Sequence, residues 1–214
     1  MSATRGTGDA DRDALDRYYT PAAWADAVVS RWRPWLTGPA APRCVLDPSV
    51  GRGAWSSALR RAGYTGEIVG VDLDPDAPGD GCDRVVRGDF ADLGPSLLAE
   101  LRPGLIVGNP PYRHLDRHAS ICLASDAAVS FLVRTAWLQS VRVGDVLGVR
   151  DAPSLLLACG RLAFDSPGKV RTSSDSADYA QVNWRPKGAQ VKPPTWELLA
   201  WKPARRRASG TGAS

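Results

Sequence analysis

Long apolar runs are missing from this 214-residue sequence. No stretch approaches the roughly 18 consecutive apolar residues that a membrane-spanning helix needs. The opening segment, residues 1–17, is polar and charged and lacks the apolar core of a secretion signal. We therefore expect a cytoplasmic protein without a membrane partner.

Cysteine and histidine are also scarce. The two histidines, His114 and His118, lie four residues apart, with no acidic residue in a recognisable metal motif, so we interpret them as surface or ligand-adjacent residues. The cysteines lie far apart and form no CxxC pair: Cys44, Cys82, Cys122 and Cys159. Neither a metal site nor a disulfide framework is expected, and the thiols should be reduced and mostly buried.

Glycine and proline are frequent but show no short repeat, and 43% of the residues are hydrophobic, which is typical of a globular chain. The length suits one domain. We predict a flexible N-terminal arm over 1–16, a single domain over 17–203 and a basic disordered tail over 204–214.

Positive charge is concentrated late in the chain. The stretch from Gly160 to Arg207 contains ten Lys or Arg residues and four acidic residues, whereas the whole chain carries a net charge of only +4. Basic side chains release the counterions condensed on phosphates, so a polyanion would suit this region. A solvated basic face is the alternative explanation.

Short apolar runs alternate with helical patterns, which predicts an α/β fold with a mainly parallel sheet covered on both faces. The expected strands are 43–47, 67–72, 84–86 and 105–108, and the expected helices are 54–62, 96–101 and 127–141. Two aromatic-rich strands, 179–184 and 195–201, are separated by a Pro/Gly/Lys loop, which predicts a C-terminal antiparallel β-hairpin.

Polar residues follow four of these strands. Asp47, Asp72, Asp89 and Asn109 each stand at or just after a strand end. Ligands of open parallel sheets bind beyond the carboxyl ends of the strands, so this set indicates a nucleoside-like ligand.

The turn after the first strand contains Pro48, Gly51 and Gly53, and glycine there lets the backbone approach a ligand closely. The spacing does not match GxGxxG, which disfavours a pyrophosphate ligand. An ordinary strand-to-helix turn would also explain the glycines.

Three acidic positions suggest contacts to a nucleoside. Asp72 can accept hydrogen bonds from both ribose hydroxyls, with Asp74 as the alternative. Asp89 can accept from an adenine amino group, beside the aromatic ring of Phe90. Core packing explains Phe90 equally well.

The segment Asn109-Pro110-Pro111-Tyr112 indicates which reaction the site could perform. The lone pair of an aromatic amine is delocalised into its ring, so the amine is a poor nucleophile. The Asn109 side-chain oxygen and the Pro110 carbonyl can accept its two hydrogens, which directs the lone pair at a methyl donor. The prolines keep these acceptors preorganised, and Tyr112 can stack on the ring.

With these residues the sequence resembles the class I amino-methyltransferases, specifically the N6-adenine DNA methyltransferases. DPSVGRG resembles the glycine motif, VGVDLDP the ribose motif, GDF the adenine motif and NPPY the catalytic motif, in the family's order. Tyr18-Tyr19-Thr20-Pro21 resembles the segment that packs over the methionine part of the cofactor. The resemblance implies a Rossmann-like methyltransferase fold with a seven-stranded sheet and S-adenosyl-L-methionine as cofactor.

The resemblance also assigns site residues. It implies catalytic roles for Asn109, Pro110, Pro111 and Tyr112. Cofactor contacts are implied for Thr20, Pro21, Asp47, Pro48, Gly51, Gly53, Asp72, Leu73, Asp89, Phe90 and Asn109. For the substrate we name Tyr112, His114, Arg161 and Lys187.

The second half is similar to small methyltransferase-like proteins of phages and prophages, in the segments 131–134, 160–164 and 178–184. Nothing here is long enough for the target-recognition domain of restriction-type relatives, so we expect a separate recognition subunit. Nucleic acid is the expected partner, DNA before RNA. The NPPY element also occurs in enzymes that methylate RNA bases (adenine N6, guanine N2) or protein glutamine, and a non-catalytic cofactor-binding module is a further alternative.

Overall fold

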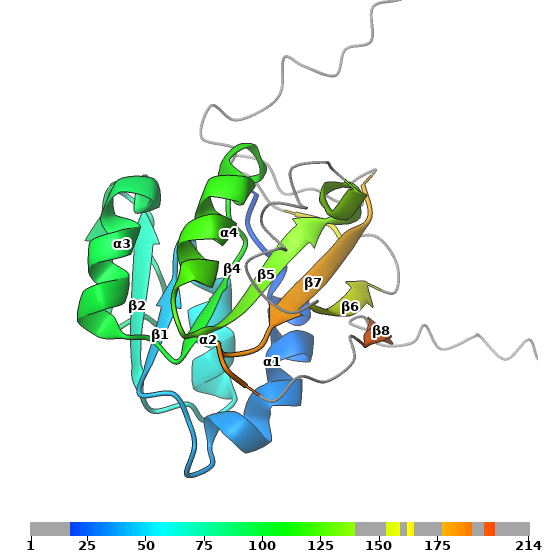
Figure 1. The fold of residues 1–214 in the computed structure, drawn as a ribbon, viewed down its shortest axis with the longest axis horizontal. Coiled ribbons are helices and arrows are strands. Elements are labelled where there is room, and N and C mark those ends of the chain that lie inside the picture. Colours follow the sequence, from blue (N-terminus) through cyan, green and yellow to red (C-terminus); the bar gives the residue numbers. More distant parts are fainter. Residues whose placement is uncertain (1–17, 140–152, 159–161, 165–176, 190–194, 200–214) are drawn as a thin grey trace, which may run out of the picture.

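A computed structural model describes residues 18–139, 153–158, 162–164, 177–189 and 195–199. The described strands form one sheet in the order β3-β2-β1-β4-β5-β7-β6-β8 (Figure 1). Their bounds are β1 Cys44–Asp47, β2 Glu67–Asp72, β3 Arg84–Arg87, β4 Leu105–Gly108, β5 Ala128–Arg134, β6 Ser154–Ala158, β7 Tyr179–Trp184 and β8 Trp196–Leu199. Strand β7 runs antiparallel to both of its neighbours, and the other paired strands are parallel.

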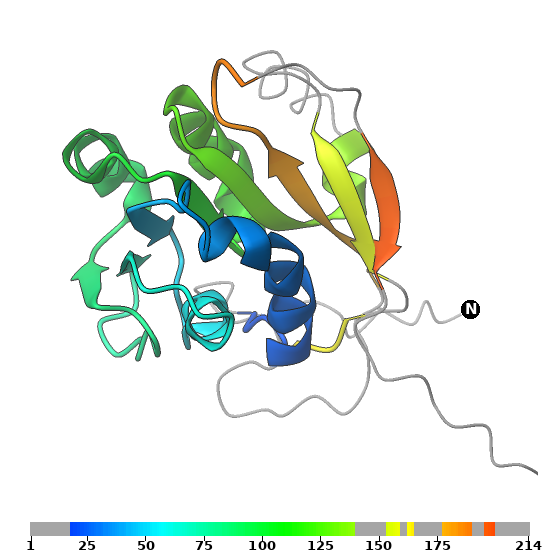
Figure 2. The same ribbon diagram turned by 90° about the horizontal axis from the view of Figure 1, so that it is seen from below.

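Helices cover both faces of the sheet. Their bounds are α1 Ala22–Leu36, α2 Ala54–Arg61, α3 Phe90–Leu101 and α4 Leu115–Ala124, and two short 3-10 helices are η1 Tyr112–His114 and η2 Thr135–Gln139. Figure 2 shows α1 and α2 on one face and α3 and α4 on the other. Each pair encloses its own apolar core, one built around Trp24 and Trp55 and the other around Phe90 and Phe131.

The sequence of α1 explains which side it buries. Trp24, Ala25, Val28 and Val29 are fully buried and recur at the spacing of one helix face. The Trp24 indole nitrogen also donates to the Gln181 side chain in β7 at 3.4 Å, which links α1 to the far half of the sheet. No helix in the described part of the chain is long and apolar enough to cross a bilayer.

The helix predicted over 127–141 is wrong. Residues 128–134 form strand β5 and 135–139 form η2, while 140 and 141 lie outside the described residues. Phe131 and Val133 pack into the α3/α4 core, whereas Leu132 packs into the α1/α2 core. A central strand that is buried on both faces loses the apolar–polar alternation of a strand, so its continuous apolar run also matched helical spacing.

The predicted C-terminal hairpin is also wrong. Strand β6 lies between β7 and β8, pairing antiparallel with β7 and parallel with β8. The two aromatic-rich strands are therefore not neighbours, and the described sheet has eight strands where seven were expected. Residues 190–194, 200 and 201 of that hairpin lie outside the described residues, as do both predicted termini.

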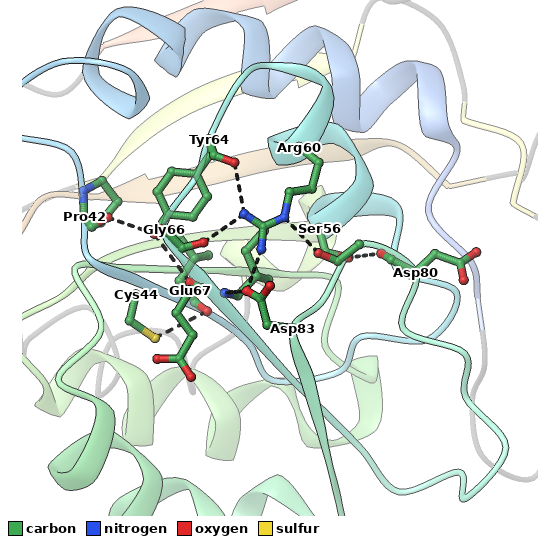
Figure 3. A network of polar contacts seen from close by, with 12 residues as sticks. Pro42, Cys44, Ser56, Arg60, Tyr64, Gly66, Glu67, Asp80 and Asp83 are labelled. Atoms are coloured by element: carbon green, nitrogen blue, oxygen red, sulfur yellow. Dashed lines mark hydrogen bonds and ion pairs between the residues drawn. The ribbon is translucent and has the colours of Figure 1, made fainter.

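One arginine ties the end of α2 to the loops that enter β2 and β3 (Figure 3). The Arg60 guanidinium donates to the carbonyl oxygens of Tyr64 at 3.0 Å, Gly66 at 2.8 Å and Gly81 at 3.2 Å. It also pairs with the carboxylate of Asp83 at 2.5 Å. These contacts hold α2, the helix after the glycine turn, against the starts of β2 and β3, the strands that Asp72 ends and Asp89 follows.

We expect Arg60→Ala to lower the free energy of unfolding by about 1–3 kcal/mol, because it leaves the carbonyl oxygens of Tyr64 and Gly66, whose bonds are partly buried, without this donor. The matched variant is Arg61→Ala, which removes an ion pair to Asp26 that is about half exposed at both ends. Such a surface pair contributes about 0–1 kcal/mol. Urea unfolding of both variants tests this, and equal losses would contradict it.

Candidate active site at the carboxyl edge of the sheet

The ends of β1 and β4 lie against each other. The two strands pair in parallel, with Leu46 opposite Ile106, so Asp47 and Gly108 come to the same edge. A side-chain carbon at Gly108 would lie 2.9 Å from an Asp47 carboxylate oxygen and 3.1 Å from the Pro48 ring. The glycine therefore allows the turn after β1 to touch the strand that leads into Asn109.

Close approach of other segments explains the two glycines of the turn after β1, and the sequence did not show this. Gly51 and Gly53 have φ angles of 51° and 77°, in the left-handed region. A side-chain carbon on Gly53 would collide with the backbone of Asp80, and one on Gly51 would lie 3.2 Å from the Tyr19 ring. Both glycines thus make room for other segments of the protein.

Asp72, at the end of β2, holds this turn in place. One carboxylate oxygen accepts from the Gly51 amide at 2.7 Å, and the other accepts from the Asp74 amide at 2.9 Å. A carboxylate has about four lone-pair positions, so each oxygen can accept one further donor. Asp74 caps its own turn by accepting from the Asp76 amide at 3.0 Å.

Asp47 is buried, and burial raises the pKa of its carboxyl to about 8. The nearby charge of Asp72 raises the pKa further, whereas the hydrogen bond from the Ser49 amide lowers it. One oxygen accepts from that amide at 3.1 Å, and the other has no partner among the described residues. A cationic ligand beside this unpartnered oxygen would favour the ionised carboxylate and lower its pKa.

This burial predicts a pH dependence of stability. From the ordinary pKa of 3.8 up to about 8, the folded chain keeps a proton on Asp47 that the unfolded chain has lost. The free energy of unfolding therefore falls as pH rises through this window. Asp47→Asn cannot titrate, so its stability relative to the parent chain should grow toward about pH 8. A difference that stays constant in denaturant unfolding would show that Asp47 is ionised in the folded chain.

The next positions along the edge come from the turns after β2 and β3. The side chain of Leu73 is 58% exposed, so an apolar surface is open beside Asp72. Asp89 caps α3 by accepting from the Ala91 amide at 2.8 Å. Phe90 is buried and stacks on His118 in α4, with ring centroids 5.3 Å apart, which favours the packing role that the sequence left open. Burial also lowers the pKa of His118.

The carboxamide of Asn109 is held from two sides. Its nitrogen donates to the backbone carbonyl of Tyr18 at 2.9 Å, and its oxygen accepts from the Tyr112 hydroxyl at 3.0 Å. An amide oxygen has two lone pairs, so one remains for another donor.

Tyr112 lies within an aromatic cluster. Its ring stacks on Tyr18 at 6.1 Å and lies 6.0 Å from Tyr179, and the Arg134 guanidinium lies 4.8 Å from its centroid. Phe164 packs against Tyr179 at 4.7 Å. Arg134, Phe164 and Tyr179 were not predicted from the sequence to belong to the site. The signal was present, because each belongs to one of the second-half segments that resemble phage proteins.

The remaining predicted residues are divided between the site and other regions. Thr20 and Pro21 directly precede α1, and the Pro21 carbonyl accepts hydrogen bonds from the amides of Trp24 and Ala25 in that helix. His114 ends η1 next to Tyr112, and Arg161 lies outside the described residues.

Lys187 lies near the amino ends of the parallel strands, opposite to the carboxyl ends where the candidate site lies. Its amide donates to the Asp126 carbonyl at 3.2 Å, just before β5 begins, whereas the site lies where the parallel strands end. An open cavity of about 700 Å³ lies at that same amino edge, between the ends of α3 and α4, and is lined by Leu98, Arg102, Ile121 and Asp126 among others. The structure therefore does not bring Lys187 or this cavity to Asn109.

Solved structures similar to this chain share its fold. A proposed class I S-adenosylmethionine-dependent methyltransferase from Listeria monocytogenes has 13% identity and a TM-score of 0.61, covering 89% of this chain and 68% of that chain. A proposed RNA methyltransferase from Pyrococcus horikoshii has 16% identity and a TM-score of 0.54, covering 79% and 85%. Spermidine synthase from Thermotoga maritima has 13% identity and a TM-score of 0.53, covering 77% and 60%.

No protein-family profile and no curated protein sequence matches the chain. At these identities the structural likeness establishes the fold and not the reaction. The chain has the Rossmann-like fold that the class I S-adenosylmethionine-dependent methyltransferases share.

Proposed function

We propose that this chain transfers a methyl group from S-adenosyl-L-methionine to an exocyclic amino nitrogen, with adenine N6 of DNA as the favoured acceptor. The observation that carries the proposal is the placement of Asn109. Asn109 directly follows Gly108, the last residue of β4, and Gly108 packs against Asp47, where the turn after β1 begins. An amine acceptor and a nucleoside ligand would then meet at one edge of the sheet.

The residues of this edge suit the cofactor. The second lone pairs of Asp72 can accept the two ribose hydroxyls, and exposed Leu73 offers an apolar surface to the adenine ring. The buried oxygen of Asp47 without a partner could contact a sulfonium or ammonium group, whose positive charge would favour the ionised carboxylate and lower its raised pKa. When bound, the cofactor supplies an electrophilic methyl carbon.

The chain's own residues then prepare the nucleophile. The free lone pair of the Asn109 oxygen and the Pro110 carbonyl would accept the two amino hydrogens, so the nitrogen becomes pyramidal and its lone pair, no longer delocalised into the ring, points toward the methyl donor. Transfer would then form a nitrogen–carbon bond, and the electron pair of the broken carbon–sulfur bond would stay on the sulfur. The methylated nitrogen finally loses one proton to solvent.

DNA adenine is favoured by the resemblance of the ordered motifs to N6-adenine DNA methyltransferases. The aromatic cluster around Tyr112 is consistent with a planar substrate, since aromatic faces can stack on a base that has left its duplex. The late basic residues give less support. Lys187 lies at the other edge, and most residues of the basic stretch lie outside the described residues.

Transfer of a tritiated methyl group tests the proposal. Unmethylated duplex DNA, single-stranded DNA, RNA and a protein extract are incubated in parallel with labelled cofactor, and labelled nucleosides are then separated. We expect the label in N6-methyladenine from DNA. Label in RNA or glutamine would replace the substrate, and cofactor binding without any transfer would indicate a non-catalytic module.

A further inference from the structure

The dipeptide Tyr18-Tyr19 touches both halves of the site. On one side, the Tyr18 carbonyl accepts from Asn109 at 2.9 Å, and its ring stacks on Tyr112. On the other side, the Tyr19 ring lies against Gly51 of the turn after β1, and the Arg52 guanidinium lies 4.2 Å from its centroid. Tyr18-Tyr19 therefore connects the glycine turn after β1 to the loop 109–112 that follows β4.

The Tyr18 carbonyl also decides which way the Asn109 amide points. A backbone carbonyl can only accept a hydrogen bond, so the group facing it must be the amide nitrogen. The amide oxygen then has to face the Tyr112 hydroxyl, as the 3.0 Å contact shows. Without the carbonyl, the amide could rotate and present its nitrogen, a donor, toward an incoming amino group.

The carbonyl itself is held firmly. Besides its stack on Tyr112, the Tyr18 ring meets the edge of Phe164 at 6.2 Å, and the Arg134 guanidinium lies 5.9 Å from its centroid. These contacts come from segments far apart in the sequence, so the position of the carbonyl is fixed by tertiary packing.

We propose that Tyr18 is a positioning residue, whose backbone carbonyl fixes the Asn109 carboxamide with its oxygen toward the acceptor amine. This inference rests on the proposed amino-methyl transfer. It has a sharp consequence: position 109 requires a carboxamide and rejects a carboxylate. A carboxylate would accept hydrogens from the amine well, but one of its oxygens would lie against the Tyr18 oxygen, where two acceptors repel each other.

The variant N109D tests this consequence. Near neutral pH we expect its transfer of tritiated methyl groups to single-stranded DNA to be about 100-fold or more below that of the parent chain. The rate should rise about tenfold for each pH unit lowered, because the protonated carboxyl can donate to the Tyr18 carbonyl. If burial alone, and not the Tyr18 carbonyl, controlled the ionisation of the carboxyl in N109D, the ionised carboxylate would be the form that accepts the amino hydrogens. Activity would then rise with pH instead. That result, or a parental rate at neutral pH, overturns the proposal.

The matched control is N183D, which makes the same change in β7. The Asn183 amide also donates weakly to backbone carbonyls, at 3.5 Å to Ser154 and 3.4 Å to Gln181, but it lies within the sheet. We expect N183D to unfold more easily and to show no gain of activity in acid.

A second measurement does not depend on turnover. Carbon-13 NMR of aspartate-labelled N109D, compared with the parent spectrum, identifies the added carboxyl and its titration. We expect its pKa to lie clearly above that of ordinary aspartate, and an ordinary pKa overturns the inference. If the parent chain methylates none of the polymers, the proposed function fails, while an ordinary pKa in this titration would separately overturn the inference about the carbonyl.

Discussion

Asn109→Ala should lower kcat for methyl transfer by about 10²–10³ while leaving cofactor affinity nearly unchanged. Losing one preorganised polar contact to a developing charge typically costs a factor of this size. The side chain contacts the Tyr18 carbonyl and the Tyr112 hydroxyl, and neither group belongs to the turn after β1. Initial rates with tritiated cofactor, together with calorimetric titration of S-adenosylhomocysteine, separate the two effects.

A matched truncation is Asn183→Ala. Asn183 accepts from the Ser130 hydroxyl within the sheet, so its loss should lower the melting temperature without a comparable loss of kcat. If Asn109→Ala weakens cofactor binding and turnover equally, the loop has a structural role and the acceptor role of Asn109 is wrong. If it has no effect on turnover, the amine must be bound elsewhere.

The strand-end residues could be predicted because parallel strands bring their ends to one edge. Asp47, Asp72 and Asn109 each follow an apolar run, and the structure places Asp47 against the strand that leads to Asn109 and joins Asp72 to the glycine turn. Local sequence was sufficient there, because a buried strand followed by a glycine turn is a short-range signal. Strands β2 and β4 begin and end at the predicted residues.

The second half of the sheet could not be predicted in the same way. Strand β5 is buried on both faces, so its periodicity was ambiguous, and β6 enters between two strands that follow it in the sequence. Pairing between strands distant in the sequence depends on tertiary packing, which no local pattern reports. Lys187 was misplaced relative to the site for this reason, since β7 runs antiparallel and carries its end to the opposite edge.

The cluster around Tyr112 shows the same limit. Arg134 stands at the end of β5, Tyr179 at the start of β7 and Phe164 in the segment between β6 and β7. Because β7 is antiparallel, its first residue lies opposite the last residue of β5, as the pairing of Tyr179 with Arg134 shows. The resemblance named these three segments, but only their assembly in the sheet shows that they meet in one aromatic cluster, where Arg134 and Tyr179 lie at the Tyr112 ring and Phe164 packs on Tyr179.

Asp72→Ala should weaken the binding of S-adenosylhomocysteine by about 1–3 kcal/mol, or roughly five- to 150-fold. The carboxylate would have two tasks, since its oxygens hold the Gly51 and Asp74 amides and, in the proposed function, also accept from the ribose hydroxyls. Removing it deprives the ribose hydroxyls of acceptors and leaves the Gly51 amide unpaired at the turn. Calorimetric titration measures the affinity, and thermal unfolding measures the loss within the fold.

The paired variant Asp74→Ala tests which of the two carboxylates contacts the ribose. Asp74 uses a side-chain oxygen to cap its own turn through the Asp76 amide, so we expect a much smaller loss of affinity from its removal. If Asp74→Ala weakens binding and Asp72→Ala does not, the ribose contact belongs to Asp74. If both variants lower the melting temperature but keep full affinity, neither carboxylate binds the cofactor, and the nucleoside must be held by other groups of the edge.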